Sequence, residues 1–423
     1  MADDLQFRRG DGVAETRADE ASAPVIGYMS GPTDGGQIVK AWRAGRKVDF
    51  FGTVYMSQFC DVIAKHQAKA VILTYSYDPA SREQIGDFTV YNVHREEGGG
   101  LKYHWESVKR ILVSLVILVQ HRAQAVVLTE GANYWFLTVL FRLAGIKIIP
   151  SIHCAVWTPY SKLSNTQRVL NFFNRIFFFR LQRGPFMGVS SLIGRQVGEW
   201  AGPTASFHRF VPNYSRETFA SIPPPPDGIF TILFAGRVEP EKGVFDLMQA
   251  VTYVRRRGTK VRLHICGEGS AVEAARAMAG ADDHIHGQCG SKTVQRLLGK
   301  SHVVVVPTRT TFEEGFAKIC AEGVLASRPV ITSRVCPALE DIRPAAVEVA
   351  PNDAAAYADA IEALARNPEF YAEMVAATVP VQAQFYDNAS SYGAVLNRAL
   401  GSLGLWTQSV SKAAPGVGKF ANL

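Results

Sequence analysis

Two glutamates, Glu314 and Glu322, lie eight residues apart after a short β-branched run at residues 303–306. Such a run, bounded by Pro307, is typical of a strand that is buried on both faces in a parallel sheet. If both glutamates were helical, their side chains would point roughly 80° apart. They converge on one ligand more easily if Glu314 stands in a loop and Glu322 in the following helix. The carboxyl edge of an open α/β sheet is where ligands bind.

The start of that helix offers a second kind of group. The backbone N–H groups of Phe316, Ala317 and Lys318 are expected to be the unpaired donors of a helix start, which favour an anion. Two carboxylates beside such donors suit a ligand that carries both hydroxyls and phosphates. The alternative is an acidic helix start that simply faces solvent and is stabilised by the helix dipole.

Cations follow another predicted strand, in the segment TILFAGRVEPEKG at residues 231–243. Arg237 and Lys242 stand five residues apart between a glycine turn and a predicted helix. A planar guanidinium fork and a point charge near a helix start fit a diphosphate. The alternative is an ordinary basic loop. A third strand, at residues 261–266, ends in Gly267-Glu268-Gly269, another tight turn.

Taken in order, the segments GRVEPEKG, ICGEG, EGFAKICAE and RPVITS resemble the C-terminal half of the retaining GT-B glycosyltransferases of family 4, over residues 229–350. The resemblance implies a role for each matching residue. Arg237 and Lys242 would hold the donor diphosphate, Glu314 would contact the transferred sugar, and Glu322 would bind the ribose of the nucleotide. The remaining donor-binding candidates are Gly236, Gly267, Gly269, Gly287, Gly315, Phe316 and Ala317.

The sequence departs from the family pattern at two places. Ala317 stands where a glycine usually follows the EGF triplet. The segment Arg334-Val335-Cys336-Pro337 precedes Glu340 where a glycine pair is usual. A bulkier loop here is expected to narrow the sugar pocket, so the identity of the donor sugar stays open.

Composition limits the class of protein. The 423 residues are 47% hydrophobic and 20% charged, which is ordinary for a folded globular chain, and the formal net charge of +7 suits anionic nucleotides or a membrane surface. Nothing in the pattern resembles a nucleic-acid-binding module, so we expect no nucleic-acid partner. The six cysteines are scattered without a C-x-x-C pair. We therefore expect buried free thiols in a reducing compartment, the cytoplasm, and no metal site.

The first half alternates predicted strands and helices, which indicates a parallel, doubly wound sheet. A predicted first strand at residues 25–29 precedes a loop with Gly35 and Gly36, and the resemblance implies that this loop faces the donor phosphates and the acceptor. A predicted strand at 146–149 precedes His153, for which the resemblance implies a place beside the acceptor and the transferred sugar. There it would donate a hydrogen bond rather than act as a base. Glu130, at another strand end, is a further acceptor-site candidate, and a surface turn or a structural histidine is the alternative in each case.

Residues 161–183 combine many aromatic and aliphatic side chains with five basic residues and no acidic one. A helix of this composition can lie on an anionic bilayer. The alternative, equally compatible with the sequence, is a core helix of the first domain with basic ends. The N-terminal residues lack the apolar region of a signal peptide, and no run reaches the length of a membrane span.

We therefore predict an α/β protein with the GT-B fold, in which two Rossmann-like domains with parallel sheets face each other across a cleft. The expected divisions are a mobile arm (1–22), an acceptor-binding domain (23–214), a Pro-rich linker (215–228), a sugar-nucleotide-binding domain (229–385), a crossover helix returning to the first domain (386–405) and a tail (406–423). The expected reaction is metal-independent transfer of a sugar from a UDP- or GDP-sugar to an acceptor hydroxyl of a glycan or lipid-linked substrate, with retention. Glu314, His153, Arg237 and Lys242 would carry it.

Two other functions remain compatible with these residues. One is a sugar-nucleotide epimerase of the same fold, which would turn over without an acceptor. The other is a non-catalytic protein that binds sugar nucleotides or acts as a scaffold at a membrane. A dinucleotide oxidoreductase is the least favoured alternative, because Gly267 and Gly269 are not followed by the third glycine of a G-x-G-x-x-G motif.

Overall fold

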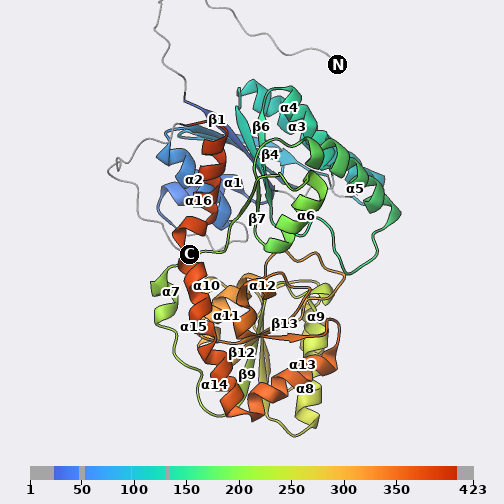
Figure 1. Ribbon diagram of the computed structural model, residues 1–423, viewed down its shortest axis with the longest axis vertical. Helices are drawn as coiled ribbons and strands as arrows, with labels where there is room; N and C mark the ends of the chain where they lie inside the picture. The colour runs from blue at the N-terminus through green and yellow to red at the C-terminus, as the bar shows by residue number, and fades with distance from the viewer. Residues whose placement is uncertain (1–22, 47–52, 97, 130–133, 407–423) are drawn as a thin grey trace, which may run out of the picture.

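The computed structural model describes residues 23–46, 53–96, 98–129 and 134–406, which form two sheets, each covered by its own helices (Figure 1). The predicted arm at 1–22 and the tail beyond Trp406 lie outside the described residues. The first sheet has the order β3-β4-β2-β1-β5-β6-β7-β8 and is parallel except for β3, which pairs antiparallel with β4. Its strands are β1 (Val25–Pro32), β2 (Lys69–Ser76), β3 (Ser81–Ile85), β4 (Phe88–His94), β5 (Ala125–Leu128), β6 (Lys147–Ile152), β7 (Phe186–Gly188) and β8 (Phe207–Arg209).

The helices of the first domain pack on both faces of this sheet, and α2 and α16 lie on the opposite side from α3, α4 and α5 (Figure 1). The central strand β5 is buried throughout, as its run of Ala, Val, Val and Leu predicts for an inner parallel strand. The helices are α1 (Gly35–Arg43), α2 (Thr53–Lys65), α3 (Leu101–Gln120), η1 (Trp135–Thr138), α4 (Val139–Leu143), α5 (Asn165–Phe177), η2 (Phe179–Leu181) and α6 (Ser191–Ala201). Helix α7 (Arg216–Ala220) lies in the predicted linker, and its Phe219 packs in the core of the second domain.

The second sheet is wholly parallel, with the order β11-β10-β9-β12-β13-β14. All four valines of β12 are buried between β9 and β13, in agreement with the prediction from their sequence. The strands are β9 (Phe230–Ala235), β10 (Val261–Cys266), β11 (Asp283–Ile285), β12 (Val303–Val306), β13 (Val330–Ser333) and β14 (Ala346–Val349). The parallel sheets confirm the predicted α/β class.

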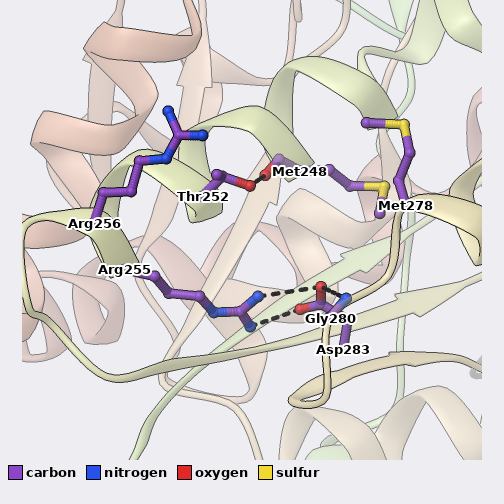
Figure 2. Close-up of a pocket in the computed structure, with 7 residues that line it drawn as sticks. All are labelled: Met248, Thr252, Arg255, Arg256, Met278, Gly280 and Asp283. Carbon is purple, nitrogen blue, oxygen red and sulfur yellow. Dashed lines mark hydrogen bonds and ion pairs between the residues drawn. The ribbon is translucent and has the colours of Figure 1, made fainter.

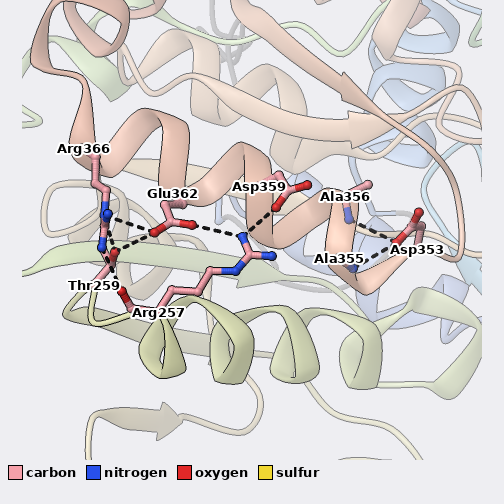
Figure 3. Close-up of polar contacts among 8 residues, drawn as sticks. All are labelled: Arg257, Thr259, Asp353, Ala355, Ala356, Asp359, Glu362 and Arg366. Carbon is pink, nitrogen blue, oxygen red and sulfur yellow. Dashed lines mark hydrogen bonds and ion pairs between the residues drawn. The ribbon is translucent and has the colours of Figure 1, made fainter.

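The helices of the second domain include α13, which begins where Asp353 accepts hydrogen bonds from two backbone N–H groups. Figure 3 shows how α13 is joined to the end of α8: Arg257 contacts Asp359 and Glu362, and Arg366 contacts Thr259. These contacts are exposed to solvent, so they add little to stability and mainly orient the two helices. The helices are η3 (Pro240–Lys242), α8 (Val244–Arg256), α9 (Val272–Met278), α10 (Ser291–Leu298), α11 (Lys318–Leu325), α12 (Leu339–Ile342), η4 (Arg343–Ala345), α13 (Ala354–Arg366), α14 (Pro368–Ala376), α15 (Thr378–Gln382), η5 (Ala383–Tyr386) and η6 (Asn388–Ser390). The last helix, α16 (Tyr392–Ser402), packs on the first domain.

The return to the first domain differs in form from the single helix predicted at 386–405. The chain passes through two 3-10 turns before α16 begins after Ser391, whose side chain accepts from the Ala394 N–H. Tyr392, Val395 and Leu396 of α16 are then buried in the core of the first domain. Their spacing of three and one residues puts them on one helix face.

One local prediction for the first half is wrong, and one edge strand was not predicted. Gly35 and Gly36 are not a loop but the first residues of α1, where the Asp34 side chain accepts from the Gln37 N–H. The edge strand β3 is absent from the prediction, since its exposed polar residues show no hydrophobic alternation.

The cysteines also differ from expectation. Cys266 at the end of β10 and Cys289, just beyond the neighbouring strand β11, form a disulfide. Cys60, Cys154, Cys320 and Cys336 are free. The expectation of free thiols throughout is therefore wrong for one pair, because adjacent parallel strands bring their carboxyl ends together from 23 residues apart.

Candidate functional site

The loop after β9 lies across the carboxyl edge of the second sheet. The Gly236 N–H donates to the Cys266 carbonyl at 2.9 Å, so the loop continues alongside the end of β10. Gly243 then begins α8 with φ +76°, and a Cβ at this position would lie 1.9 Å from the Pro307 carbonyl oxygen after β12. Glycine is required here both for the left-handed backbone and for this close approach. The packing places Lys242 beside the segment that follows β12.

Lys242 and Glu314 form a buried ion pair. The Lys242 Nζ lies 2.6 Å from the Glu314 Oε2, and the two side chains are 16% and 8% exposed. The Thr308 hydroxyl donates to the same carboxylate oxygen at 3.2 Å. Both contacts fall on Oε2, so Oε1 keeps its accepting capacity for another group. Because this pair is shielded from solvent, removal of either partner would leave a charge that is expensive to bury.

An aromatic ring holds the two predicted phosphate-binding cations together. The Arg237 guanidinium lies 5.3 Å and the Lys242 ammonium 4.1 Å from the centre of the Phe312 ring. Both distances are within the range of cation–π attraction. Arg237 is exposed while Lys242 is largely covered. The pair therefore offers one accessible and one buried positive charge on the same edge of the sheet.

His153 reaches the same place from the first domain. It directly follows β6, and its carbonyl oxygen would lie 1.7 Å from a Cβ on Gly315 of the second domain. Its ring is surrounded by Tyr55 and Phe210, and its Nε2 lies 3.0 Å from the Ser151 hydroxyl. Burial, followed by the nearby Lys318 charge, lowers the pKa of His153 to about 3. The imidazole is therefore neutral at physiological pH, and its charged form would not be available for catalysis.

Cys154, which follows His153, interacts electrostatically with charged residues of the second domain. The residue is exposed to solvent, but the protein around its thiol raises the pKa of that thiol; Glu314 and Glu313 add to the increase, and Lys242 and Arg237 reduce it. The Cys154 side chain of the first domain thus interacts electrostatically with two carboxylates and both cations of the second domain. The structure brings Arg237, Lys242, Glu314 and His153 together, as the sequence predicted.

The neutral state of His153 leads to a prediction for stability. An unfolded histidine takes up a proton near pH 6.5, whereas the folded one does so only near pH 3, so the contribution is complete above pH 6.5 and is lost as the pH falls. In the wild-type protein the free energy of unfolding should decrease between pH 7 and pH 5. In His153→Phe, which keeps an aromatic ring among Tyr55 and Phe210, this decrease should be smaller by about 1–2 kcal/mol.

Urea unfolding at both pH values measures that difference. The matched control is His94→Phe, because His94 is exposed at the end of β4. Equal pH dependence in the wild-type protein and His153→Phe would contradict the prediction.

Glu322 lies on α11, in the helix where it was predicted. The Tyr214 hydroxyl donates to its Oε1 at 3.2 Å. Burial raises the pKa of Glu322, while Lys318 and the hydrogen bond from Tyr214 oppose the increase. Burial conversely lowers the pKa of Lys318, whose ammonium lies 5.2 Å from the centre of the Tyr55 ring in the first domain.

Several of these neighbours were missed by sequence reasoning. Lys318 carried a usable signal, since it precedes Glu322 by four residues and so lies on the same helix face. Tyr214, Tyr55, Thr308 and Phe312 carried none, because they come from distant segments and single residues of these types are common in any core.

The predicted donor-binding glycines line the other strand ends. Gly267 has φ +145°, its N–H donates to the Gly287 carbonyl at 2.7 Å, and a Cβ on it would lie 1.8 Å from the Gly236 carbonyl oxygen. Gly269 approaches the Val238 carbonyl in the same way. These turns pack the ends of β9, β10 and β11 tightly together. Phe316 and Ala317 follow Gly315 directly, and Ala317 is the N-cap residue of α11.

The other predicted residues lie elsewhere or outside the described chain. The backbone of Gly35 packs against Thr74 and Val90, and that of Gly36 lies beside Glu83, all in the first domain. Glu130 lies outside the described residues. The segment with Arg334 contacts the first domain, where the Tyr160 hydroxyl donates to the Arg334 carbonyl at 2.7 Å.

A surface hollow of about 380 Å³ lies away from these residues. Figure 2 shows it between α8 and the start of β11, where Arg255 and Asp283 form an ion pair at 2.6 Å. It opens at the amino end of β11, opposite the edge that carries Arg237 and Lys242. Within the described ranges, no three His, Cys, Asp or Glu side chains are grouped so that they could hold a metal ion.

Comparison with known proteins agrees with this geometry. Residues 229–367 match the family Glycosyl transferases group 1. Over 115 residues the chain is 26% identical to lipopolysaccharide 1,2-N-acetylglucosaminetransferase of Salmonella typhimurium; the match covers 24% of this chain, which spans only 30% of the length of that relative.

Solved structures of similar architecture cover nearly the whole chain. Sucrose-phosphate synthase from Thermosynechococcus elongatus has a TM-score of 0.66 at 15% identity, with 90% of this chain and 98% of that one covered. Trehalose-6-phosphate synthase gives 0.64 at 12%, with 92% and 100% covered. A protein of Anabaena in complex with UDP and glucose gives 0.61 at 11%, with 90% and 99% covered. The chain therefore has the GT-B fold, and residues 229–367 of its second domain match the Glycosyl transferases group 1 family.

Proposed function

We propose that this protein is a retaining glycosyltransferase of family 4. It transfers a sugar from a UDP- or GDP-sugar to an acceptor hydroxyl in the synthesis of a polysaccharide, glycolipid or lipid-linked oligosaccharide. The observation that carries the proposal is the meeting of Arg237, Lys242 and Glu314 at the strand ends of one domain with His153 of the other. Such a set of groups suits a ligand that contains a nucleoside diphosphate and a sugar. The complex of the Anabaena protein with UDP and glucose, on the same fold, favours UDP.

The chemistry follows from what each group can do. As the bond between sugar and diphosphate breaks, negative charge grows on the leaving phosphate, and Arg237 and Lys242 stabilise it in a water-poor site. Glu314 offers its free Oε1 to a sugar hydroxyl. The Nε2 of His153 is engaged by Ser151, so the other ring nitrogen serves the sugar. Two fixed cations take the place of a metal ion, and the reaction proceeds without one.

The nucleotide is bound on the carboxyl edge of the second sheet in this proposal. Glu322 binds the ribose, and Gly267, Gly269 and Gly287 let the nucleotide approach the backbone closely. The N–H groups of Phe316, Ala317 and Lys318 have no hydrogen-bond acceptor within the described part of the chain, which leaves them for phosphate oxygens. The acceptor enters from the first domain, beside His153.

A thermal-shift screen with UDP, GDP and ADP tests this proposal. A ligand at a hundredfold excess over its Kd stabilises the folded state by about 2.7 kcal/mol, which corresponds to about 5 °C for a domain of this size. We expect that increase for one base, and its loss in Arg237→Ala with Lys242→Ala. The matched control, Lys260→Ala with Lys300→Ala, removes two exposed lysines of the same domain and should keep the shift.

No shift with any nucleotide would overturn the proposal and favour a scaffold protein. For the nucleotide that binds, proton NMR of the product's anomeric centre tests retention, and transfer in the presence of EDTA tests independence of a metal ion.

A further inference from the structure

Helix α5 exposes its apolar side. Val169, Phe172 and Phe177 are 55%, 59% and 44% exposed, although they recur at the spacing of a single helix face. Asn174 is the buried residue of this helix, and its side chain accepts from the Phe136 N–H. The helix thus turns a polar residue toward the protein and part of its apolar side outward. Leu170 packs against the core of the first domain, and Phe178 and Phe179, which follow α5, are buried there, so the segment at 161–183 combines a core contact with an exposed apolar side.

A second exposed stripe runs along α3. Leu101, Trp105 and Val116 are 88%, 63% and 55% exposed and lie on one face. A series of ring contacts joins the start of α3 to α5: His104 contacts Tyr134, Tyr134 contacts Phe136, and Phe136 contacts Phe173. Figure 1 places both helices on the same side of the first domain. We call the exposed apolar residues of α3 and α5 the apolar face; contiguous surfaces of this kind mark interaction sites.

The charges around α5 all have one sign. Lys162, Arg168, Arg175, Arg180 and Arg183 are exposed, and none forms an ion pair with another described residue. Between residues 101 and 183 the described acidic residue is Glu106, which is buried and paired with Lys109. A second copy of the chain would bring the same positive charges against these. A lipid bilayer with anionic headgroups above an apolar interior complements both the positive charges and the exposed apolar side chains.

We propose that the apolar face docks on an anionic lipid bilayer, with α5 lying in the headgroup region. The helices of the described residues are too short or too polar to cross a bilayer, so the contact is a surface one in which aromatic side chains enter the interface and arginines meet lipid phosphates. Docking through α3 and α5 holds the acceptor-binding domain at the membrane. The proposal goes beyond the transfer reaction and needs neither donor nor acceptor.

Sedimentation of the full chain with vesicles tests the proposal. We expect binding to equimolar phosphatidylcholine and phosphatidylglycerol to exceed binding to phosphatidylcholine alone by about tenfold or more, and to weaken as salt is added. Arg168→Glu with Arg175→Glu, and separately Phe172→Ser with Phe177→Ser, should each lower the partition coefficient by about tenfold. The control is Lys260→Glu with Lys300→Glu in the second domain, which should bind as the wild type does.

Each substituted side chain is exposed, so the variants should fold, and an unchanged nucleotide thermal shift verifies this. The proposal is overturned if the wild-type protein does not bind anionic vesicles, or if both double variants bind as it does. It is also overturned if vesicles bind no protein while sedimentation velocity shows a dimer, and the double substitution Phe172→Ser with Phe177→Ser dissociates that dimer. A nucleotide shift that persists without vesicle binding would leave the transferase proposal intact.

Discussion

Replacement of Glu314 by Gln is expected to lower kcat/KM for sugar transfer by about 10²–10³-fold. The substitution keeps the shape of the side chain but removes the charge that Lys242 contacts at 2.6 Å, where both side chains are largely buried. Loss of one preorganised charged contact in a water-poor active site removes about 2.7–4 kcal/mol of transition-state stabilisation, and about 1.4 kcal/mol corresponds to a tenfold change in rate. The released lysine would also compete for the position of the diphosphate. The measurement is the initial rate of nucleotide release with donor and acceptor present.

Two further variants show whether the effect belongs to the pair. Glu241→Gln removes an exposed carboxylate next to Lys242 in sequence and should change the rate by less than about twofold, as expected for a surface charge. Lys242→Met combined with Glu314→Gln should lower kcat/KM by less than the product of the two single effects, because the double variant leaves no buried charge without a partner. Additive losses, or a folded Glu314→Gln protein with nearly wild-type activity, would refute the proposed role of the pair.

Much of the second domain could be predicted from sequence because its signals are local. The buried valines of β12, the glycine turns after β9 and β10, and the spacing of Glu314 and Glu322 each lie within one short segment. Their order along a parallel sheet then brings them to one edge. The ion pair between Lys242 and Glu314, by contrast, depends on how the turn at Gly243 packs against Pro307, a contact between distant segments.

The first domain shows where local patterns fail. The amphipathic pattern of α5 is visible in the sequence, but whether its aromatic side meets the core or solvent depends on neighbouring elements. The same holds for Cys266 and Cys289, which pair because two strands are adjacent. Phe210 is apolar and fully buried without being in a strand, since it packs against His153 and Tyr392 rather than in the sheet. In each of these cases the surroundings of the side chain depend on tertiary packing and cannot be predicted from the type of residue alone.

Gly315 stands where the two domains touch, and its replacement by Ala is expected to lower the transfer rate by about 10²-fold. An added Cβ would lie 1.7 Å from the His153 carbonyl oxygen and 3.0 Å from the Cys154 Cα, both backbone atoms that cannot move aside as a side-chain tip does. The loop that carries Glu314 must therefore shift away from the first domain. A displacement of about 1 Å between catalytic groups and substrate costs about 10²-fold in rate.

Most of the nucleotide contacts in our proposal lie outside this loop, so Gly315→Ala should lose less in nucleotide affinity than in the rate of sugar transfer. Isothermal titration with the nucleotide and the steady-state rate separate the two quantities. Gly198→Ala on α6 is the control, since a Cβ there meets no atom within 4 Å. If Gly315→Ala transfers sugar at the wild-type rate, then His153 and Glu314 do not need their observed separation, and the site between the domains is not where transfer occurs. If it loses the rate and the nucleotide affinity to the same extent, the loop acts through donor binding alone and not through the contact between the two domains.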